Sequence, residues 1–258
     1  ATPTPFHYQQ AIHALSVGKH VYLEIPMTRT LQEGESLAEA AQRSGRILTV
    51  GHTLRAYHEY ESIRRKVDEG AVGKPGNIRL GRRTPHPRRW YSNPESSGGV
   101  VLDSMIHEFD FLRWCFGPVR RVFCQSLQGR MNVDALDYAL ASLRLESGAI
   151  AHVESSWCHY GQYQMDAEVA GDKGFIQYNN QETIPLMVPF IDPKESSRQY
   201  FSESPVIKPA HYKILEGFIA AIEGRGQNPV PPEEGLQSLR IALAALESIR
   251  TRKPVAIP

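Results

Sequence analysis

Apolar and polar positions in the first 75 residues follow two different periods in turn. Helical spacing predicts helices up to about residue 17, at 30–44 and at 57–69, and short apolar runs predict strands at 21–23 and 47–50. The run Thr30-Leu31-Gln32-Glu33 has the capping-box arrangement that opens a helix. Strands that alternate with helices favour a parallel sheet with crossover helices, so we expect an α/β unit over residues 1–75.

The pattern changes after residue 75. Apolar runs predict strands at 77–83, 119–126, 137–145, 149–157, 165–170 and 175–178, and helical spacing predicts helices around 102–114, 211–223 and 232–250. The connections between most of these strands are short and rich in turn residues, which favours antiparallel pairing. Residues 76–258 therefore read as an α+β unit, with a large, mostly antiparallel open sheet flanked by helices. Its C-terminal helices return toward the first unit.

Composition and net charge argue against several functional classes. The 258 residues carry a net charge of +1, which gives no electrostatic case for binding nucleic acid or an anionic membrane. No apolar run has membrane-spanning length and no signal peptide opens the chain. The three cysteines lack metal-ligand spacing and the ten histidines form no His-Glu-x-x-His motif. We expect a cytoplasmic protein with reduced thiols and no metal site.

Two residues stand out as candidate chemistry. Asp103 and His107 are four residues apart in a segment with helical spacing, and such positions share one face of a helix. A carboxylate one turn from an imidazole can orient the ring and stabilise its charged form. We therefore predict that His107 and Asp103 form an acid/base pair.

The loop predicted between residues 82 and 99 is rich in arginine, proline and aromatic residues. Arginine suits carboxylate or phosphate groups, and aromatic faces suit sugars or other rings. We expect one or two of its members to face a ligand, and the candidates are His86, Arg89, Trp90 and Tyr91.

Six segments together resemble one known family. They are Thr2-Pro3-Thr4-Pro5-Phe6-His7, Gly18-Lys19-His20-Val21 with Glu24-Ile25-Pro26, Gly51-His52-Thr53-Leu54-Arg55, Gly98-Gly99 through Asp103, His107 and Asp110, Glu216-Gly217-Phe218, and the closing stretch from Gly235 to Val255. Single segments are weak signals, but six in the same order are a strong one. Their order resembles the glucose–fructose oxidoreductase/inositol dehydrogenase/MocA (Gfo/Idh/MocA) family of NAD(P)-dependent oxidoreductases.

The resemblance implies a fold and a set of roles. Residues 1–75 would be the C-terminal half of a Rossmann-type dinucleotide-binding domain, and 76–258 the domain for substrate binding and oligomerisation through the open sheet. His107 would be the general acid/base, Asp103 its orienter or a substrate ligand, and Arg55 would face the cleft. Positions that match contacts to NAD or NADP are Thr2, Pro3, His7, Glu24 and Pro26. The implied substrate is a small polyhydroxylated or carboxylated ring compound such as a sugar or cyclitol.

Two departures from the family pattern affect the expected activity. The sequence contains no G-x-G-x-x-G loop, which in a Rossmann domain holds the pyrophosphate. Isoleucine stands at position 25, where the family has a catalytic lysine, and it can neither carry charge nor donate a hydrogen bond. The chain thus resembles a family member that lacks the first half of its Rossmann domain, and we expect no conventional NAD(P) binding by this chain alone. A partner chain could supply that half.

Three alternatives remain open from the sequence. The His107/Asp103 pair could serve a non-redox lyase, isomerase or decarboxylase that needs no nucleotide. The chain could be a non-catalytic subunit or binding protein that pairs through an exposed sheet edge. It could also be a fragment of a longer protein.

Overall fold

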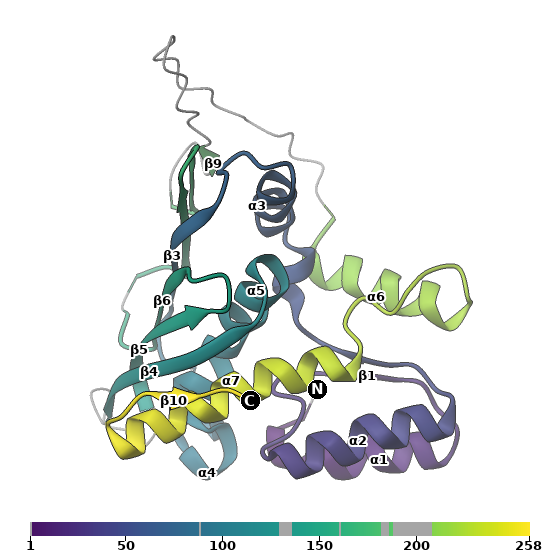
Figure 1. The fold of residues 1–258 in the computed structure, drawn as a ribbon. Coiled ribbons are helices and arrows are strands. Elements are labelled where there is room, and N and C mark those ends of the chain that lie inside the picture. The colour runs from purple at the N-terminus through teal and green to yellow at the C-terminus, as the bar shows by residue number, and fades with distance from the viewer. Residues whose placement is uncertain (1, 88, 129–135, 160, 182–185, 188–207) are drawn as a thin grey trace.

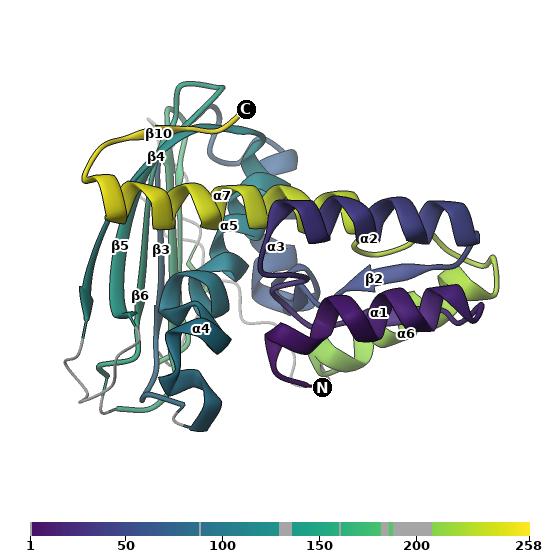
Figure 2. The ribbon, with the colours of Figure 1, turned by 90° about the horizontal axis from the view of Figure 1, so that it is seen from below.

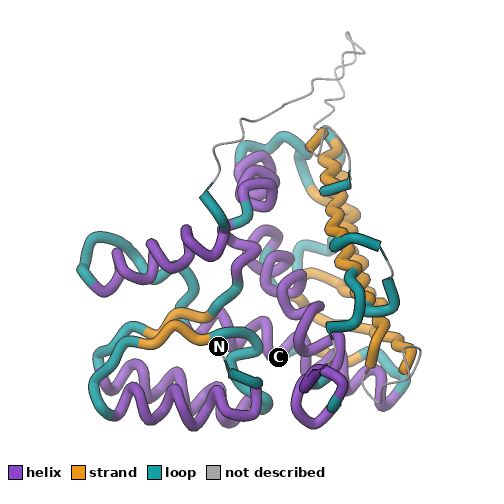
Figure 3. Tube along the Cα trace, turned by 180° about the vertical axis from the view of Figure 1, so that it is seen from behind, coloured by secondary structure: helices purple, strands orange, loops and turns teal. Residues whose placement is uncertain are grey.

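The computed structural model describes residues 2–87, 89–128, 136–159, 161–181, 186–187 and 208–258 (Figure 1). Their strands form two separate sheets, one of two strands and one of eight. Figure 3 shows the small and the large sheet as distinct blocks of strand with helices between them. No helix in the described ranges is long and apolar enough to cross a bilayer.

The N-terminal unit alternates helix and strand as predicted. Its elements are η1 (Thr4–Phe6), α1 (His7–Ser16), β1 (Val21–Leu23), α2 (Leu31–Ser44) and β2 (Leu48–Val50). β1 and β2 are parallel. Thr30 caps α2, because its hydroxyl accepts the backbone N–H of Glu33 at 3.2 Å, and Gly45 ends the helix with φ +62°. The predicted helix start and the Thr30 cap are confirmed, while the Glu33 carboxylate accepts the N–H of Arg29 at 3.3 Å rather than that of Thr30.

The large sheet has the order β10-β4-β5-β6-β3-β7-β8-β9. Its strands are β3 (Pro75–Arg83), β4 (Val119–Gln128), β5 (Leu136–Leu145), β6 (Ile150–Ser156), β7 (Gln164–Gly171), β8 (Phe175–Asn179), β9 (Leu186–Met187) and β10 (Val255–Ala256). All neighbours are antiparallel except β3 and β6, which run parallel. The expected fold, a small parallel sheet followed by a large and mostly antiparallel one, is confirmed.

The remaining helices lie between the two sheets or beside the small one. They are η2 (Thr53–Ala56), α3 (His58–Asp68), η3 (Arg89–Ser92), α4 (Pro94–Ser97), the π-helical turn η4 (Val101–Met105), α5 (Ile106–Phe116), α6 (Ala210–Ile222) and α7 (Pro232–Thr251). Figure 2 shows α5 and α7 on one face of the large sheet, whose other face carries no described helix.

α7 joins the two units. It packs against α2, α5 and β4 and runs from the small sheet to the large one (Figure 2). Two glycines permit the close approach: a Cβ on Gly235 would lie 2.8 Å from Val50, and a Cβ on Gly34 would lie 2.9 Å from Leu236. Any side chain at either position would push α7 away from the N-terminal unit.

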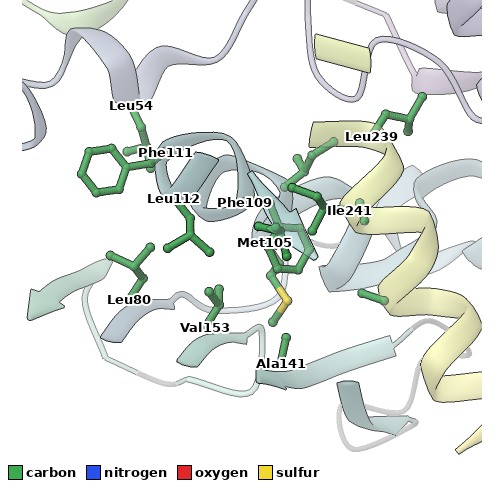
Figure 4. Close-up of a cluster of buried hydrophobic side chains, with 14 of the residues drawn as sticks. Leu54, Leu80, Met105, Phe109, Phe111, Leu112, Ala141, Val153, Leu239 and Ile241 are labelled. Carbon is green, nitrogen blue, oxygen red and sulfur yellow. The ribbon is translucent and has the colours of Figure 1, made fainter. Parts of the chain in front are cut away.

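The hydrophobic core is continuous across this junction. Figure 4 shows Met105 and Phe109 between Ala141 and Val153 of the large sheet and Leu239 of α7. All five side chains are essentially buried. The helix that carries Asp103 and His107 is therefore fixed on both sides by packed hydrocarbon.

Two sequence expectations need correction. The predicted loop at 82–99 is partly regular, since Arg82 and Arg83 extend β3, and η3 and α4 follow. The segment 101–105 is a π turn and not an α turn. It follows Gly98 and Gly99, which have φ of +73° and +69°, a backbone conformation that side chains other than glycine seldom adopt. π turns are frequent where a helix carries functional residues.

Candidate functional site

A cavity of about 540 Å³ opens between the two units. Asp103 and His107 both line it, and so does Ile25. Sequence-predicted residues on its wall also include Thr2, Pro3, His7, Glu24, Trp90 and Tyr91. Predicted site residues from 2–24 and from 90–107 therefore line the same cavity.

The N-terminal wall is held by the ring of His7. Its Nδ1 lies 2.9 Å from the carbonyl oxygen of Pro26, and its Nε2 lies 2.9 Å from that of Thr2. Pro26 therefore contributes a carbonyl that fixes His7, and is not itself on the cavity wall. The Thr4 hydroxyl lines the same side, is buried, and has no hydrogen-bond partner within the described chain.

Asp103 and His107 share the cavity without touching each other. No hydrogen bond or ion pair joins them in the described structure, although Asp103 was expected to orient the ring. The structure brings both residues to one cavity and records no bond between them, so the two roles predicted for Asp103, orienter of the ring or substrate ligand, stay predictions.

Burial sets the protonation of both groups. It raises the pKa of Asp103 to about 7, against an opposing effect of the Arg82 charge. It lowers the pKa of His107 well below 6.5, and Arg82, His52 and His211 lower it further. At neutral pH His107 is therefore an uncharged ring that can accept a proton, and Asp103 is about half protonated.

Arg55 lies outside the cavity wall, contrary to the prediction of a cleft-facing residue. Its guanidinium donates to both carboxylate oxygens of Asp110, at 2.6 and 2.7 Å, and to Glu234 at 2.8 Å. Arg113 also pairs with Glu234. Arg55 lies in η2, just after β2, and its side chain pairs with residues of both α5 and α7 and so ties these helices together.

The four candidates from the predicted loop at 82–99 do not all lie at the cavity. Trp90 and Tyr91 stack on each other with ring centroids 3.9 Å apart, and both line the cavity. The ring of His86 packs edge-on against Trp157, with centroids 5.0 Å apart, and is not on the cavity wall. The side chain of Arg89 lies outside what the structure describes.

Arg82 and Tyr163 are cavity residues that we did not predict. The Nε of Arg82 donates to the buried carboxylate of Glu108 at 2.8 Å, and its Nη1 donates to the hydroxyl of Tyr163. The alternation Ile78, Leu80, Arg82 along β3 was the available signal, because these residues share one face of the strand. Tyr163 precedes β7 and has no comparable sequence signal.

The cavity wall includes four further residues that were not among the predicted site residues. They are Gly51, Thr53, Tyr57 and His211. The cavity cation Arg82 is already paired with Glu108, whose pKa burial raises against the effect of Arg82. Within the described residues, no group of three His, Cys, Asp or Glu side chains could hold a metal ion.

The residues present fit one end of a nicotinamide nucleotide. Thr2, Pro3, His7 and Glu24 line one side of the cavity, and the unpartnered Thr4 hydroxyl could hydrogen-bond a carboxamide there. No glycine-rich loop for the pyrophosphate occurs in these 258 residues.

Family comparisons agree with the motifs and the fold. Residues 1–52 match the oxidoreductase family with an NAD-binding Rossmann fold, and residues 60–177 match the GFO/IDH/MocA C-terminal domain. Both models describe parts of one family of NAD(P)-dependent oxidoreductases. The chain belongs to the Gfo/Idh/MocA family.

Individual relatives cover nearly the whole chain. The 1,5-anhydro-D-fructose reductase of Ensifer adhaerens is 28% identical over 100% of this chain and 78% of its own length. The myo-inositol 2-dehydrogenase of Thermotoga maritima is 26% identical over 98% of this chain and 77% of its own. A levoglucosan dehydrogenase structure, a complex with NADH, has TM-score 0.87 at 23% identity, over 100% of this chain and 78% of that one, which supports the fold.

Proposed function

We propose that this chain provides the substrate side of an oxidoreductase site for a small polyhydroxylated or carboxylated ring compound. The observation that carries the proposal is the position of His107. It is an uncharged imidazole on the wall of a cavity of about 540 Å³, has no hydrogen-bond partner among the described residues, and lies beside the residues that match the nicotinamide end of the cofactor. The relatives named for inositol and anhydrofructose support a sugar or cyclitol as substrate.

The cavity wall offers binding groups of the kind such a ring needs. The stacked faces of Trp90 and Tyr91 would contact ring carbons, and Asp103 and Tyr163 would hydrogen-bond hydroxyl groups. Apolar faces combined with a few polar groups fix both the plane of a ring and the order of its substituents. Residues 1–75 would then form the nucleotide side of the site and residues 76–258 the substrate side.

His107 would take the proton from the reacting hydroxyl. A general base must be neutral to accept a proton, and burial holds His107 in that form at neutral pH. Asp103, with a pKa of about 7, would hold the same or a neighbouring hydroxyl as either donor or acceptor. NAD or NADP, when bound, supplies the carbon that accepts the hydride. Ile25 packs at the cavity wall and adds neither charge nor hydrogen bond.

Conventional nucleotide binding would need residues beyond these 258. The support is the missing glycine-rich loop together with the outer edge of β1, which pairs with no described strand. A strand from a partner chain could pair with that edge. The face of the large sheet that no described helix covers would serve association of two copies (Figure 2).

A second candidate is a non-redox proton transfer, and Ile25 favours it. Without a lysine beside the reacting oxygen, a neutral His107 could still remove a proton from carbon next to a carbonyl. Such a reaction would enolise, eliminate or isomerise a keto-sugar without nucleotide.

Two measurements separate these candidates. Calorimetric titration with NAD(H) and NADP(H) should show no binding in the micromolar range for this chain alone, and micromolar binding would overturn the need for added residues. A panel of cyclitols, sugars and sugar acids, assayed at high nucleotide concentration by absorbance of the reduced nicotinamide, tests redox turnover. Deuterium exchange into keto-cyclitols without nucleotide tests the alternative. The absence of both activities, and of any binding of panel compounds, would refute the proposal.

A further inference from the structure

His52 lies directly behind His107 and does not line the cavity. It follows β2, is 1% exposed, and its ring meets that of His107 nearly at right angles, with centroids 6.2 Å apart. The Nδ1 atoms of both rings are enclosed, and neither has a hydrogen-bond partner. Two unpaired polar atoms on adjacent buried rings need an explanation, because an unmade buried hydrogen bond is destabilising.

The other ring nitrogen of His52 is held in place. Its Nε2 lies 2.8 Å from the hydroxyl oxygen of Ser238 and 4.0 Å from a carboxylate oxygen of Asp110. Ser238 also lies 2.9 Å from the carbonyl oxygen of Gly235, and both contacts are satisfied together when its single hydrogen goes to Gly235 and Nε2 of His52 donates to Ser238. The negative Asp110 favours a hydrogen at the same nitrogen. Burial lowers the pKa of His52 to about 4, so the ring is neutral and its Nδ1 carries a lone pair.

We propose that His52 is a positioning residue, which holds His107 in the tautomer with hydrogen on Nδ1, so that the Nε2 of His107 is the proton acceptor in the cavity. Each ring has an enclosed Nδ1 without a partner among the described residues, and a lone pair on the Nδ1 of His52 is complementary to a hydrogen on the Nδ1 of His107. This inference deepens the role proposed for His107 and rests on it. In many histidine sites the bond made by one ring nitrogen decides the state of the other.

The geometry supports this assignment on the cavity side as well. The Nε2 of His107 has no hydrogen-bond partner among the described residues, yet it is not among the enclosed unpartnered atoms, so it is the nitrogen that reaches the cavity. Centroids 6.2 Å apart leave the two Nδ1 atoms too far apart for a direct bond. A small ring movement or one bridging water would close the gap, and catalytic hydrogen bonds often tighten only when substrate is bound.

Other charged and titratable groups around His107 do not compete for its Nδ1. Arg82 from β3 is bonded to Glu108 and Tyr163, and His211 from α6 and Asp103 from the π turn make no hydrogen bond to the ring. Within the described chain, His52 is therefore the residue placed to set the tautomer.

The direct test is a nitrogen–proton correlation spectrum of protein labelled with ¹⁵N-histidine, at pH 7.5, with neither nucleotide nor substrate added. Variants His107→Gln and His52→Gln assign the two signals among the ten histidines. The expected spectrum has hydrogen on Nδ1 of His107 and on Nε2 of His52. A spectrum with hydrogen on Nε2 of His107 would overturn the inference.

Ser238→Ala tests the same claim without altering either histidine. Removing the hydroxyl should release His52 and give His107 a mixture of tautomers, with kcat reduced about 10-fold and KM little changed. The matched control is Ser248→Ala, which removes another fully buried α7 hydroxyl, bonded to the N–H of Cys124 and the carbonyl of Lys253. The control should leave the His107 signal unchanged.

A pair of variants at position 52 completes the test. His52→Asn keeps an oxygen near the place of Nδ1 and should retain the His107 tautomer in part, whereas His52→Leu should lose it. An unchanged His107 signal in both His52→Leu and Ser238→Ala would refute the inference. Because the spectrum needs no turnover, loss of the proposed function and loss of this inference are separate outcomes.

Discussion

The helix that begins near Val101 carries buried ionisable groups in two contrasting settings. At its inner end Asp110 is fully buried and bonded through both oxygens to Arg55, which also pairs with Glu234. One to two turns earlier, Asp103 and His107 face the cavity with no ionic partner in the described structure. Arg55, Asp110 and Glu234 form ion pairs with one another, and we call them the matched group. Asp103 and His107 have no ionic partner in the described structure, and we call them the unmatched group.

The difference separates stability from chemistry. A buried ion pair keeps its charge over a wide pH range and is costly to break, so it fixes α5 against α7. An unmatched group adjusts its pKa toward neutrality, which suits a residue that must gain or lose a proton at neutral pH. Asp103, His107 and Asp110 lie close together in one family motif, but their surroundings differ and they are not equivalent.

The largest expected effect comes from breaking the matched group. Arg55→Met should lower the free energy of unfolding by about 3–5 kcal/mol, because it leaves the Asp110 carboxylate buried without its partner. Denaturant unfolding measures the change. As a control, Arg43→Met removes an exposed pair with Glu39 and should change stability by less than about 0.5 kcal/mol. Equal effects of the two substitutions would contradict a structural role for Arg55.

The complementary change removes the unmatched histidine. His107→Asn should reduce the rate of whichever reaction the wild type catalyses by about 100-fold or more, since a general base contributes that much. It breaks no hydrogen bond of the described structure, so the free energy of unfolding should change by less than about 1 kcal/mol. His13→Asn on the exposed face of α1 is the control. Full activity of His107→Asn would remove the proposed base.

Asp103 predicts a pH-dependent contrast with Asp110. Burial raises its pKa from 3.8 to about 7. The contribution of protonated Asp103 to the stability of the folded protein is therefore fully present below pH 3.8 and is lost as the pH rises to about 7. Asp103→Asn cannot ionise, and should be more stable than the wild type by about 4 kcal/mol above pH 7 and nearly equal to it near pH 4. Unfolding curves at pH 4 and 8 measure this, and a gap that is constant with pH would contradict the raised pKa.

The smallest effect is expected at the exposed edge of the matched group. The Glu234 side chain is 30% exposed, and despite partial burial its pKa is lowered by Arg55 and Arg113. Glu234→Gln should destabilise the protein by about 1 kcal/mol at pH 7, and its effect should fade as the pH falls below 4.5. Thermal unfolding at pH 7 and 4 provides the test. A loss as large as that of Arg55→Met would mean that the contribution of these ion pairs to stability does not depend on how deeply they are buried.

Local signals explain why most of the fold could be predicted. The Thr30 cap, the two-residue period of β3 and the helical spacing of α7 each depend on neighbouring residues alone. The π turn at 101–105 has no such signal, because it depends on how the helix packs after Gly98 and Gly99. The short strands β9 and β10 owe their existence to neighbouring strands.

The spacing of residues in the sequence could place candidate site residues on one helix, but it could not show which residues each side chain contacts. Asp103 and His107 were found from their spacing, and Trp90 and Tyr91 from their composition. The partners of Arg55 come from α5 and α7, 55 and 179 residues away, so sequence alone could not distinguish an ion pair from a substrate contact. The contact of His52 with Ser238 spans 186 residues and was equally inaccessible.

The ionisation of the His107 ring tests the central claim most directly. A pH titration by nuclear magnetic resonance follows its ring signals from pH 8 to pH 5. The account predicts that His107 stays neutral throughout this range, because burial lowers its pKa well below 6.5. A His107 ring that becomes charged at or above pH 6.5 would contradict the account, because it would place a matched cation where we infer an unpaired base.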